Sequence, residues 1–305
     1  MWGGTDEAES IRTIRSAVDR GINFIDTAPV YGFGRSEEIV GKALKGHVQR
    51  DKIVVATKVG LEWDDKENVA RNATRSRIFK EIDDSLRRLQ TDYVDLYQVH
   101  WPDPLVPVEE TARAMADLLE QGKIRAVGVS NFSTAQMDAF RGVAPLHSVQ
   151  PPFNLFERAI ESDVLPYAKA HGLSVLAYGS LCRGLLSGKM TPDTVFKGDD
   201  LRRHDPKFKA PAYPHYLKAV AELNALAAAR YGKAVLDLSI RWVLDKGAIA
   251  LWGARHPGQL EPVGRISGWS LNPADMQAID AIIDRHIAVP IGPEFMAPPS
   301  RKKEK

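Results

Sequence analysis

The sequence has few of the features that mark secreted, membrane-bound or nucleic-acid-binding proteins. It contains one cysteine, Cys182, among 305 residues, which excludes an intrachain disulfide and is typical of a reducing compartment. No apolar run approaches the roughly 18 residues of a membrane-spanning helix, and the first residues lack a signal-peptide pattern. The net charge of +2 is too small for a nucleic-acid-binding surface. We therefore expect a cytoplasmic protein without membrane or nucleic-acid partners.

The patterns of a metal site and of a Rossmann nucleotide-binding loop are also absent. No Asp, Glu and His residues cluster with the spacing of metal ligands, so we expect no metal, and a metallohydrolase is disfavoured. No Gly-x-Gly-x-x-Gly sequence follows an early strand. This weighs against an open dinucleotide-binding sheet.

Short apolar runs alternate with segments of helical periodicity along the chain. The runs predict seven strands, near residues 22–25, 52–57, 93–99, 123–129, 147–149, 173–177 and 248–251. The periodic segments predict helices near residues 6–20, 35–45, 74–90, 108–120, 134–140, 160–170, 219–229, 235–244 and 274–283. Because such alternation is typical of parallel strands covered by helices, we predict an α/β fold, a (β/α)8 TIM barrel. An open doubly wound sheet is the alternative.

Two stretches depart from a regular barrel. A closed barrel of this type needs eight strands, and because the chain opens with a helix, the missing strand would be the first. Residues 188–215 are polar, contain prolines and lack periodicity, which is typical of a functional lid or a disordered segment. We predict a single barrel domain over residues 1–290 and an irregular C-terminal tail at residues 291–305.

Polar side chains stand where the predicted strands end. In a parallel barrel these ends lie on one face, where active sites are built. Each residue alone has an ordinary structural explanation, such as a turn cap for Asp26 or a solvated side chain for Lys58. A lysine at the end of so apolar a strand is rare unless a carboxylate compensates its charge, which favours a functional site. The residues are Asp26, Lys58, His100, Ser130, Asn131, Gln150 and Tyr178.

Three of these side chains, with Tyr31 just beyond the first predicted strand, suit the protonation of a carbonyl oxygen. A free phenol, with a pKa near ~10, is a poor acid at neutral pH, and we expect the Lys58 ammonium to lower the pKa of Tyr31. Asp26 would hold Lys58 charged, and His100 could orient a carbonyl by hydrogen bonding. Such a site protonates the oxygen while another group delivers hydride to carbon.

These residues lie in motifs that resemble the aldo-keto reductases, in a group that also includes the potassium-channel beta subunits. The beta subunits lack a histidine at the position of His100, so the chain is more similar to the bacterial enzymes of the group. The resemblance covers nearly the whole chain and implies a (β/α)8 barrel and carbonyl–alcohol interconversion with NADPH/NADP+. It implies a catalytic tetrad of Asp26, Tyr31, Lys58 and His100, with Tyr31 as the acid. The matching motifs are Asp26-Thr27-Ala28 with Tyr31, Thr57-Lys58, Gln98-Val99-His100-Trp101, Gly128-Val129-Ser130-Asn131-Phe132, Gln150, Ala177-Tyr178, Gly188-Lys189 and Gly253-Ala254-Arg255.

The resemblance also assigns the cofactor contacts. Ser130, Asn131 and Gln150 match residues that bind the nicotinamide amide, and Tyr178 matches the ring that stacks on it. The residues at the adenosine end include Arg255, which matches a contact to the 2′-phosphate and favours NADPH over NADH. Residues 188–215 would fold over the cofactor as a clasp. The remaining matches are Ser180, Leu181, Gly184 and Lys189 along the pyrophosphate, and Gly253 and Gln259 at the adenosine end.

The chain differs from the family pattern at three places. Pro262 and Val263 replace a Glu-Asn pair near the adenine, so adenine recognition must differ. Leu251-Trp252 replaces Ile-Pro before Gly253. At the start, only the end of a glycine-rich turn, Trp2-Gly3-Gly4, is present, so the predicted barrel lacks the N-terminal hairpin and the first strand. An open seam of that kind would expose unpaired backbone groups.

We therefore expect an NADPH-dependent oxidoreductase that reduces aldehydes or ketones, sugar-like or small and aliphatic, to alcohols. A nucleotide-binding sensor or scaffold with little turnover is the alternative, because the first strand is missing. A barrel lyase or hydrolase with Asp26 or His100 as base is a third. The sequence names neither the substrate nor the oligomeric state.

Overall fold

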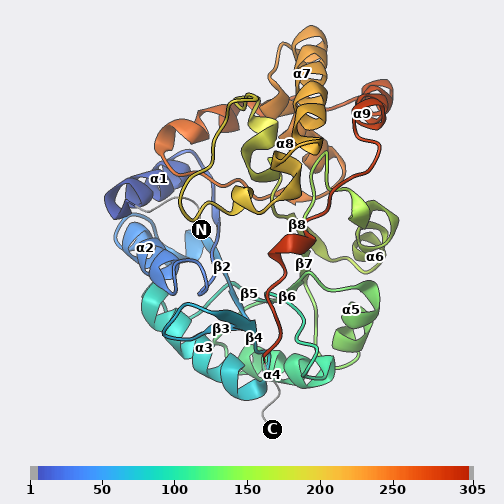
Figure 1. Ribbon diagram of the computed structural model, residues 1–305. Helices are drawn as coiled ribbons and strands as arrows, with labels where there is room; N and C mark the ends of the chain where they lie inside the picture. Colours follow the sequence, from blue (N-terminus) through green and yellow to red (C-terminus); the bar gives the residue numbers. More distant parts are fainter. Residues whose placement is uncertain (1–5, 302–305) are drawn as a thin grey trace.

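Seven parallel strands form a curled sheet at the centre of the structure, a computed structural model that describes residues 6–301 (Figure 1). The strands pair in the order β1-β2-β5-β6-β7-β8-β9, and every pairing is parallel. Each predicted strand is present, with its bounds shifted by a few residues. The strands are β1 Phe24–Asp26, β2 Val54–Val59, β5 Leu96–Val99, β6 Val127–Ser130, β7 Ser148–Gln150, β8 Ser174–Ala177 and β9 Ile249–Ala250.

Helices surround the sheet and account for the alternation seen in the sequence (Figure 1). Several begin at a side-chain cap, as at Asp6, Thr74 and Asn272, whose oxygens accept a backbone N–H of the first turn. None of the helices in residues 6–301 is long and apolar enough to cross a membrane. The helices are α1 Glu7–Asp19, α2 Arg35–Leu44, α3 Arg75–Leu89, α4 Val108–Glu120, α5 Thr134–Arg141, α6 Val164–Ala170, α7 Ala212–Tyr231, α8 Val235–Asp245 and α9 Pro273–His286.

The two faces of the sheet have different compositions, and this difference positions the site. The outward face packs on the helices in one large apolar core, which includes Val99 and Val129 from the strands and Ile78 from α3. Inside the sheet a separate small cluster centres on Ala56, Leu96 and Leu176. Polar side chains follow these apolar residues along the strands, so they gather at the carboxyl ends. The fold therefore agrees with the predicted α/β barrel class.

Two segments were not foreseen in this form. An antiparallel hairpin, β3 Leu61–Trp63 and β4 Val69–Arg71, lies between β2 and α3. The long loop after residue 188 contains two short turns of 3-10 helix, Leu201–Arg203 and Pro206–Phe208. Helix α7 begins at Ala212, earlier than predicted, so the irregular stretch ends before residue 215.

The C-terminal segment, coloured red in Figure 1, crosses the carboxyl ends of the strands. It ends against hairpin β3–β4, where the backbone N–H of Arg71 donates to the Pro299 carbonyl at 2.9 Å and its guanidinium donates to the Pro298 carbonyl at 2.8 Å. Arg301 forms an ion pair with Asp103 at 2.9 Å. The segment predicted as a tail is therefore anchored to the barrel at this end.

The sheet has β1 and β9 at its two edges, and no pairing joins these strands within residues 6–301. This is the place where a further strand of an eight-stranded barrel would lie. The residues on which the prediction of a missing first strand rests, Trp2-Gly3-Gly4, lie outside the described residues. That part of the prediction stays a prediction.

Candidate active site

A buried ion pair lies at the carboxyl end of β1 and β2. The Lys58 Nζ is 2.6 Å from Asp26 Oδ2 and donates to the Thr27 carbonyl at 2.9 Å. The Lys58 side chain has no exposed surface, and that of Asp26 is 13% exposed. Burial alone would lower the pKa of Lys58, but the Asp26 carboxylate and Tyr31 outweigh it and the pKa is raised. Lys58 is therefore charged across neutral pH.

Tyr31 lies on a tight turn that follows β1 and faces Lys58. The turn needs left-handed backbone at three successive residues, Gly32, Phe33 and Gly34. The Tyr31 hydroxyl hydrogen-bonds to Lys58, and the Lys58 Nζ is 5.2 Å from the centre of the Tyr31 ring. The turn thus delivers a phenol to the buried ion pair.

The pKa of Tyr31 corrects one expectation from the sequence. We expected Lys58 to lower this pKa below its ordinary value of 10.0. The net shift is upward, because burial of the phenol and the nearby Asp26 charge outweigh the attraction of the ammonium. Tyr31 therefore holds its proton throughout the neutral range.

His100 directly follows β5 and completes this group. Its ring meets the Tyr31 ring edge to face, with centroids 5.8 Å apart and planes at 83°. Burial and the charge of Lys58 lower the pKa of His100 well below 6.5. The imidazole is therefore neutral at neutral pH and can donate one hydrogen bond without carrying charge.

A second group of polar side chains lies at the carboxyl ends of β6, β7 and β8. The Ser130 hydroxyl donates to the Gln150 backbone carbonyl at 2.7 Å. The Asn131 amide nitrogen donates to the His100 carbonyl at 3.0 Å, and its oxygen accepts from the Tyr178 hydroxyl at 2.9 Å. These contacts connect the second group to the first through the backbone of His100.

Asp26 also connects the two groups through its second oxygen. Asp26 Oδ1 accepts hydrogen bonds from the side-chain amides of Gln150, at 2.9 Å, and Gln98, at 3.2 Å. The Gln150 amide nitrogen also lies 3.3 Å from Gln98 Oε1. One carboxylate is thus shared by the lysine and by two amides from the interior of the sheet.

The loop after β8 contains three further residues of interest. Ser180 is buried, and its hydroxyl donates to the Ala177 carbonyl at 2.8 Å. Leu181 is half-buried and precedes a turn of positive φ that includes Arg183 (54°) and Gly184 (89°). This loop follows Tyr178 directly, so it lies beside the second group.

Four buried charges hold this loop to the rest of the molecule, and sequence reasoning missed them. Arg183 pairs with Glu157 and, at 2.6 Å, with Asp205. Lys207 lies 2.9 Å from Glu157 and donates to the Ile291 carbonyl at 2.8 Å. None of the four side chains exposes more than 3% of its surface. This buried charge network joins the loops after β7 and β8, the long loop and the C-terminal segment.

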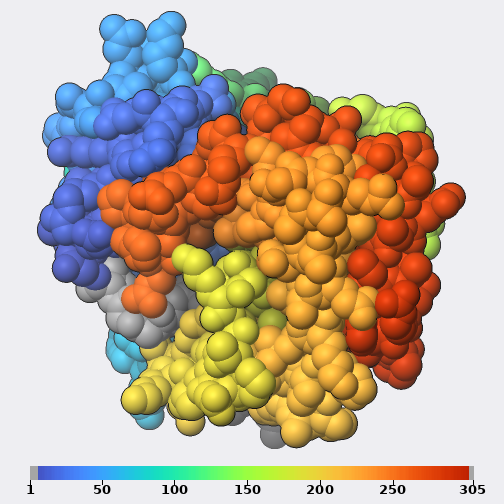
Figure 2. Space-filling view, turned by 90° about the horizontal axis from the view of Figure 1, so that it is seen from above, coloured from blue at the N-terminus to red at the C-terminus, as the bar shows by residue number. Residues whose placement is uncertain are grey.

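The remaining predicted residues lie outside these groups. Lys189 is exposed at the start of the long loop. Gly253 and Arg255 are exposed in the segment after β9, where Gln259 Oε1 accepts the backbone N–H of Arg255 at 2.6 Å. In Figure 2 the surface is hollowed between the long loop, in yellow, and this segment, in orange.

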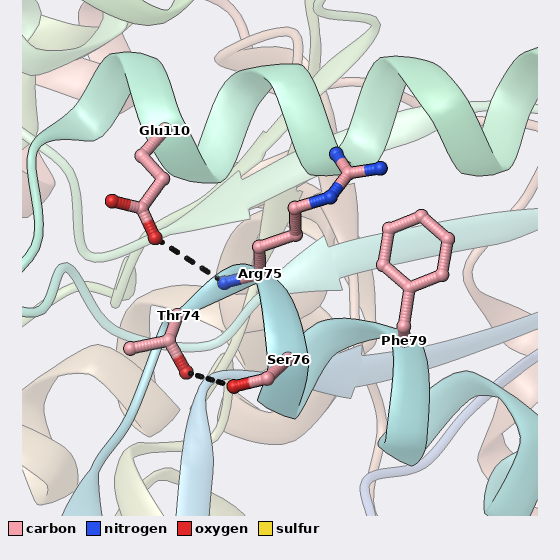
Figure 3. Close-up of a pocket in the computed structure, with 5 residues that line it drawn as sticks. All are labelled: Thr74, Arg75, Ser76, Phe79 and Glu110. Carbon is pink, nitrogen blue, oxygen red and sulfur yellow. Dashed lines mark hydrogen bonds between the residues drawn. The ribbon is translucent and has the colours of Figure 1, made fainter.

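A surface depression of about 590 Å³ lies away from the strand ends and is not the site (Figure 3). It is a shallow groove where the start of α3 meets α4, and its polar groups satisfy one another. The Thr74 and Ser76 hydroxyls are 3.2 Å apart, and the Arg75 backbone N–H points to Glu110 at 3.5 Å. Within residues 6–301 no cluster of three or more His, Cys, Asp or Glu side chains could hold a metal ion.

The fold and the site define a class of protein: a parallel barrel enzyme with converging polar side chains at the carboxyl ends of its strands. A family model described as the aldo/keto reductase family matches residues 1–284. The chain is 61% identical over 305 residues to aldo-keto reductase YhdN of Bacillus subtilis (strain 168), a match that covers 99% of this chain and 92% of the relative.

Solved structures give the same result. The glycerol dehydrogenase AKR11B4 from Gluconobacter oxydans is 55% identical, with a TM-score of 0.88 over 97% of this chain and 91% of that one. An aldo/keto reductase from Klebsiella pneumoniae in complex with NADP and acetate is 28% identical, with a TM-score of 0.71 over 99% of this chain and 91% of that one. The chain belongs to the aldo/keto reductase family, a family of oxidoreductases.

The buried charge network generates a prediction about stability. Lys207→Met keeps the length of the side chain but leaves Glu157 and Asp205 with Arg183 as their only cation within the network. Removing one partner of a buried ionic group costs about 3–5 kcal/mol, so we expect the free energy of unfolding to fall by that order in denaturant titrations. Lys209→Met, at an exposed lysine two residues away, is the control. Equal stability of the two variants would contradict the prediction.

Proposed function

We propose that the protein reduces small aldehydes or ketones to alcohols with NADPH, and that Tyr31 donates the proton. The observation that carries this proposal is the contact of the Tyr31 hydroxyl with a buried, charged Lys58, which is itself held by Asp26 at 2.6 Å. Tyr31 remains protonated at neutral pH because burial raises its pKa. Its proton is therefore available, while the ammonium stabilises the phenolate formed when the proton leaves.

His100 and the neighbouring aromatic rings would receive the substrate. The neutral imidazole can donate a hydrogen bond to a carbonyl oxygen, which aligns that oxygen with the Tyr31 hydroxyl. Trp63 on β3 and Trp101 pack in the same apolar cluster as Tyr31, and the Phe33 ring lies 5.6 Å from Trp63. This aromatic wall suits a small aliphatic or sugar-like carbonyl compound, since both present C–H surfaces to ring faces.

The polar residues of the second group fit a nicotinamide cofactor. When bound, the reduced nicotinamide ring supplies hydride to the carbonyl carbon. Ser130, Asn131 and Gln150 would hold its amide, and Tyr178, beside Asn131, would stack on the ring. Because both amide hydrogen bonds of the Gln150 nitrogen point inward, its side-chain oxygen is the atom that remains to accept a ligand N–H.

Residues farther along the chain would bind the remainder of the cofactor. Ser180, Leu181, Gly184 and Lys189 would line the pyrophosphate. Gly253, Arg255 and Gln259 would line the adenosine, beside the hollow seen in Figure 2. The Klebsiella relative whose structure contains NADP supports this choice of cofactor. A guanidinium such as Arg255 is well suited to a 2′-phosphate.

Tyr31→Phe tests the proposed proton donor. General acid catalysis contributes about 10²- to 10⁴-fold to rates, so we expect kcat/KM for an aldehyde panel to fall by at least about a hundredfold. The consumption of NADPH is followed by its absorbance. Tyr167→Phe, at a tyrosine whose hydroxyl contacts Asp138 on the helical surface, is the control and should match the wild type. NADPH binding without turnover in the wild type would instead favour a sensor or scaffold.

The pKa directions predict the pH dependence of the reaction. Reduction needs the protonated phenol, and the pKa of Tyr31 lies above 10.0. We therefore expect kcat for reduction to stay level from about pH 7 to about pH 9 and to fall as the pH rises past the pKa of Tyr31. Oxidation of the alcohol needs the phenolate, so its rate should rise over the same alkaline range. A reductive rate that falls by half near neutral pH would contradict the assignment.

Arg255→Ala tests the preference for NADPH. Loss of a charge-assisted contact costs about 1.5–3 kcal/mol, so we expect the Kd for NADPH to rise by about tenfold or more. The Kd for NADH should stay unchanged, because NADH lacks the 2′-phosphate. Arg285→Ala, at an exposed arginine on α9, is the matched control. An equal rise in Kd for both nucleotides would show that Arg255 does not bind the 2′-phosphate.

A further inference from the structure

Gln98 is a buried polar residue of the barrel interior to which neither the family motifs nor the proposed mechanism gives a role. It lies on β5, two residues before His100, and its side chain has no exposed surface. Its amide nitrogen donates to Asp26 Oδ1 at 3.2 Å, and its amide oxygen accepts from Gln150 at 3.3 Å. It touches the carboxylate that holds Lys58, but not Lys58 or Tyr31 themselves.

The strand register explains how Gln98 reaches Asp26. Lys58, Gln98, Gly128 and Ser148 are successive partners across β2, β5, β6 and β7, so their side chains share the inner face. At Gly128 an added Cβ would lie 2.9 Å from Gln98 Cγ and would clash with Ser148 Oγ. Because Gly128 has no side chain, the space beside its Cα is open and the Gln98 side chain occupies it.

Asp26 needs a donor at the position of Gln98. Its Oδ2 accepts from Lys58, and Oδ1 faces the interior of the sheet, where the side-chain amides of Gln98 and Gln150 are its hydrogen-bond donors. A buried carboxylate oxygen without donors is costly. With both amides present, the carboxylate has one orientation that satisfies all of its partners.

We propose that Gln98 is a positioning residue of the active site, which fixes the Asp26 carboxylate toward Lys58 and, through Gln150, orients the amide that faces the cofactor. This inference rests on the proposed reductase function. Gln98 acts through Asp26, Lys58 and Gln150, and makes no contact with the reacting atoms. Gln98 therefore helps to fix the geometry of the tetrad from the interior of the barrel.

Gln98→Met is the direct test, because methionine has a similar length and cannot hydrogen-bond to Asp26. Hydrogen bonds to charged groups are strong enough that we expect kcat for reduction to fall by about tenfold to a hundredfold. The KM for the aldehyde should change much less than kcat, because Gln98 does not line the substrate wall. An unchanged kcat would overturn the proposal.

Ser148→Ala provides a matched control from the same row of the interior. The Ser148 hydroxyl is buried and has no hydrogen-bond partner among the described residues, and it lies beside the same glycine. This variant also removes a buried polar group from the inner face, yet it leaves Asp26 untouched. We expect wild-type kcat. If Ser148→Ala and Gln98→Met lose activity equally, Gln98 serves only packing and the proposal fails.

Gln98→Glu gives a readout that a packing role would not produce. A protonated glutamic acid can donate to Asp26 in place of the amide, whereas the ionised form faces a second carboxylate. Burial and this like charge raise the pKa of the introduced carboxyl. We therefore expect kcat close to that of the wild type at low pH and a loss as the pH rises, with no such recovery in Gln98→Met. The absence of this difference would overturn the proposal.

The ionisation of Tyr31 gives a second readout that needs no turnover. The charged groups facing Tyr31 are Lys58 and Asp26, with His100 and Tyr178 as its other titratable neighbours. Without Gln98 the negative charge of Asp26 is less compensated, so the Tyr31 proton is held more tightly and its pKa rises. Tyrosinate absorbance, taken as the difference from the Tyr31→Phe counterpart, should shift to higher pH in Gln98→Met. An unchanged titration would count against the proposal.

The experiments distinguish a failure of the proposed function from a failure of the proposed role of Gln98. If wild type and Tyr31→Phe reduce every carbonyl equally slowly, the proposed function is wrong, whatever Gln98 does. If the wild type is active and Gln98→Met is equally active, the function stands and the inference falls. Melting temperatures of all variants identify any loss that comes from unfolding.

Discussion

The ion pair between Lys58 and Asp26 is the constraint around which the carboxyl end of the barrel is built. An ammonium with no exposed surface would lose its proton or destabilise the fold unless an anion and hydrogen-bond acceptors surround it. Asp26 supplies the anion, and the Thr27 carbonyl and the Tyr31 hydroxyl supply further contacts. The second oxygen of the Asp26 carboxylate also requires hydrogen-bond donors, and the buried amides of Gln98 and Gln150 supply them.

The same reasoning applies to the loops above the barrel. Arg183, Lys207, Glu157 and Asp205 come from three loops, and none could be buried without the others. Two positive and two negative charges make the network neutral, and their mutual attraction offsets part of the cost of burying them. The Lys207 contact to the Ile291 carbonyl brings in the C-terminal segment. These charges thereby help to give the long irregular loops a defined position, together with apolar contacts such as that of the Phe196 and Phe208 rings.

The sequence predicted the fold class and the seven strands because parallel strands covered by helices leave continuous apolar runs. The parallel arrangement also predicted that the residues at the strand ends lie on one face of the barrel. Hairpin β3–β4 was missed because residues 61–71 are mostly polar and contain no continuous apolar run. The buried charges were missed because an isolated Glu157 or Asp205 has the sequence features of a surface residue. The direction of the Tyr31 pKa was wrong because burial, which dominates it, has no signature in the sequence.

The interior also explains why the two halves of the site depend on one another. Asp26 and Gln150 lie on β1 and β7, which are not neighbours in the sheet, and are 124 positions apart in the chain. Their hydrogen bond crosses the inside of the curled sheet and joins the side of the proposed proton donor to the side proposed to bind the cofactor. A carboxylate that serves both sides cannot move toward one without leaving the other. The proposed delivery of hydride and proton to one carbonyl requires such a fixed relation, and the buried amides beneath the proposed tetrad would provide it.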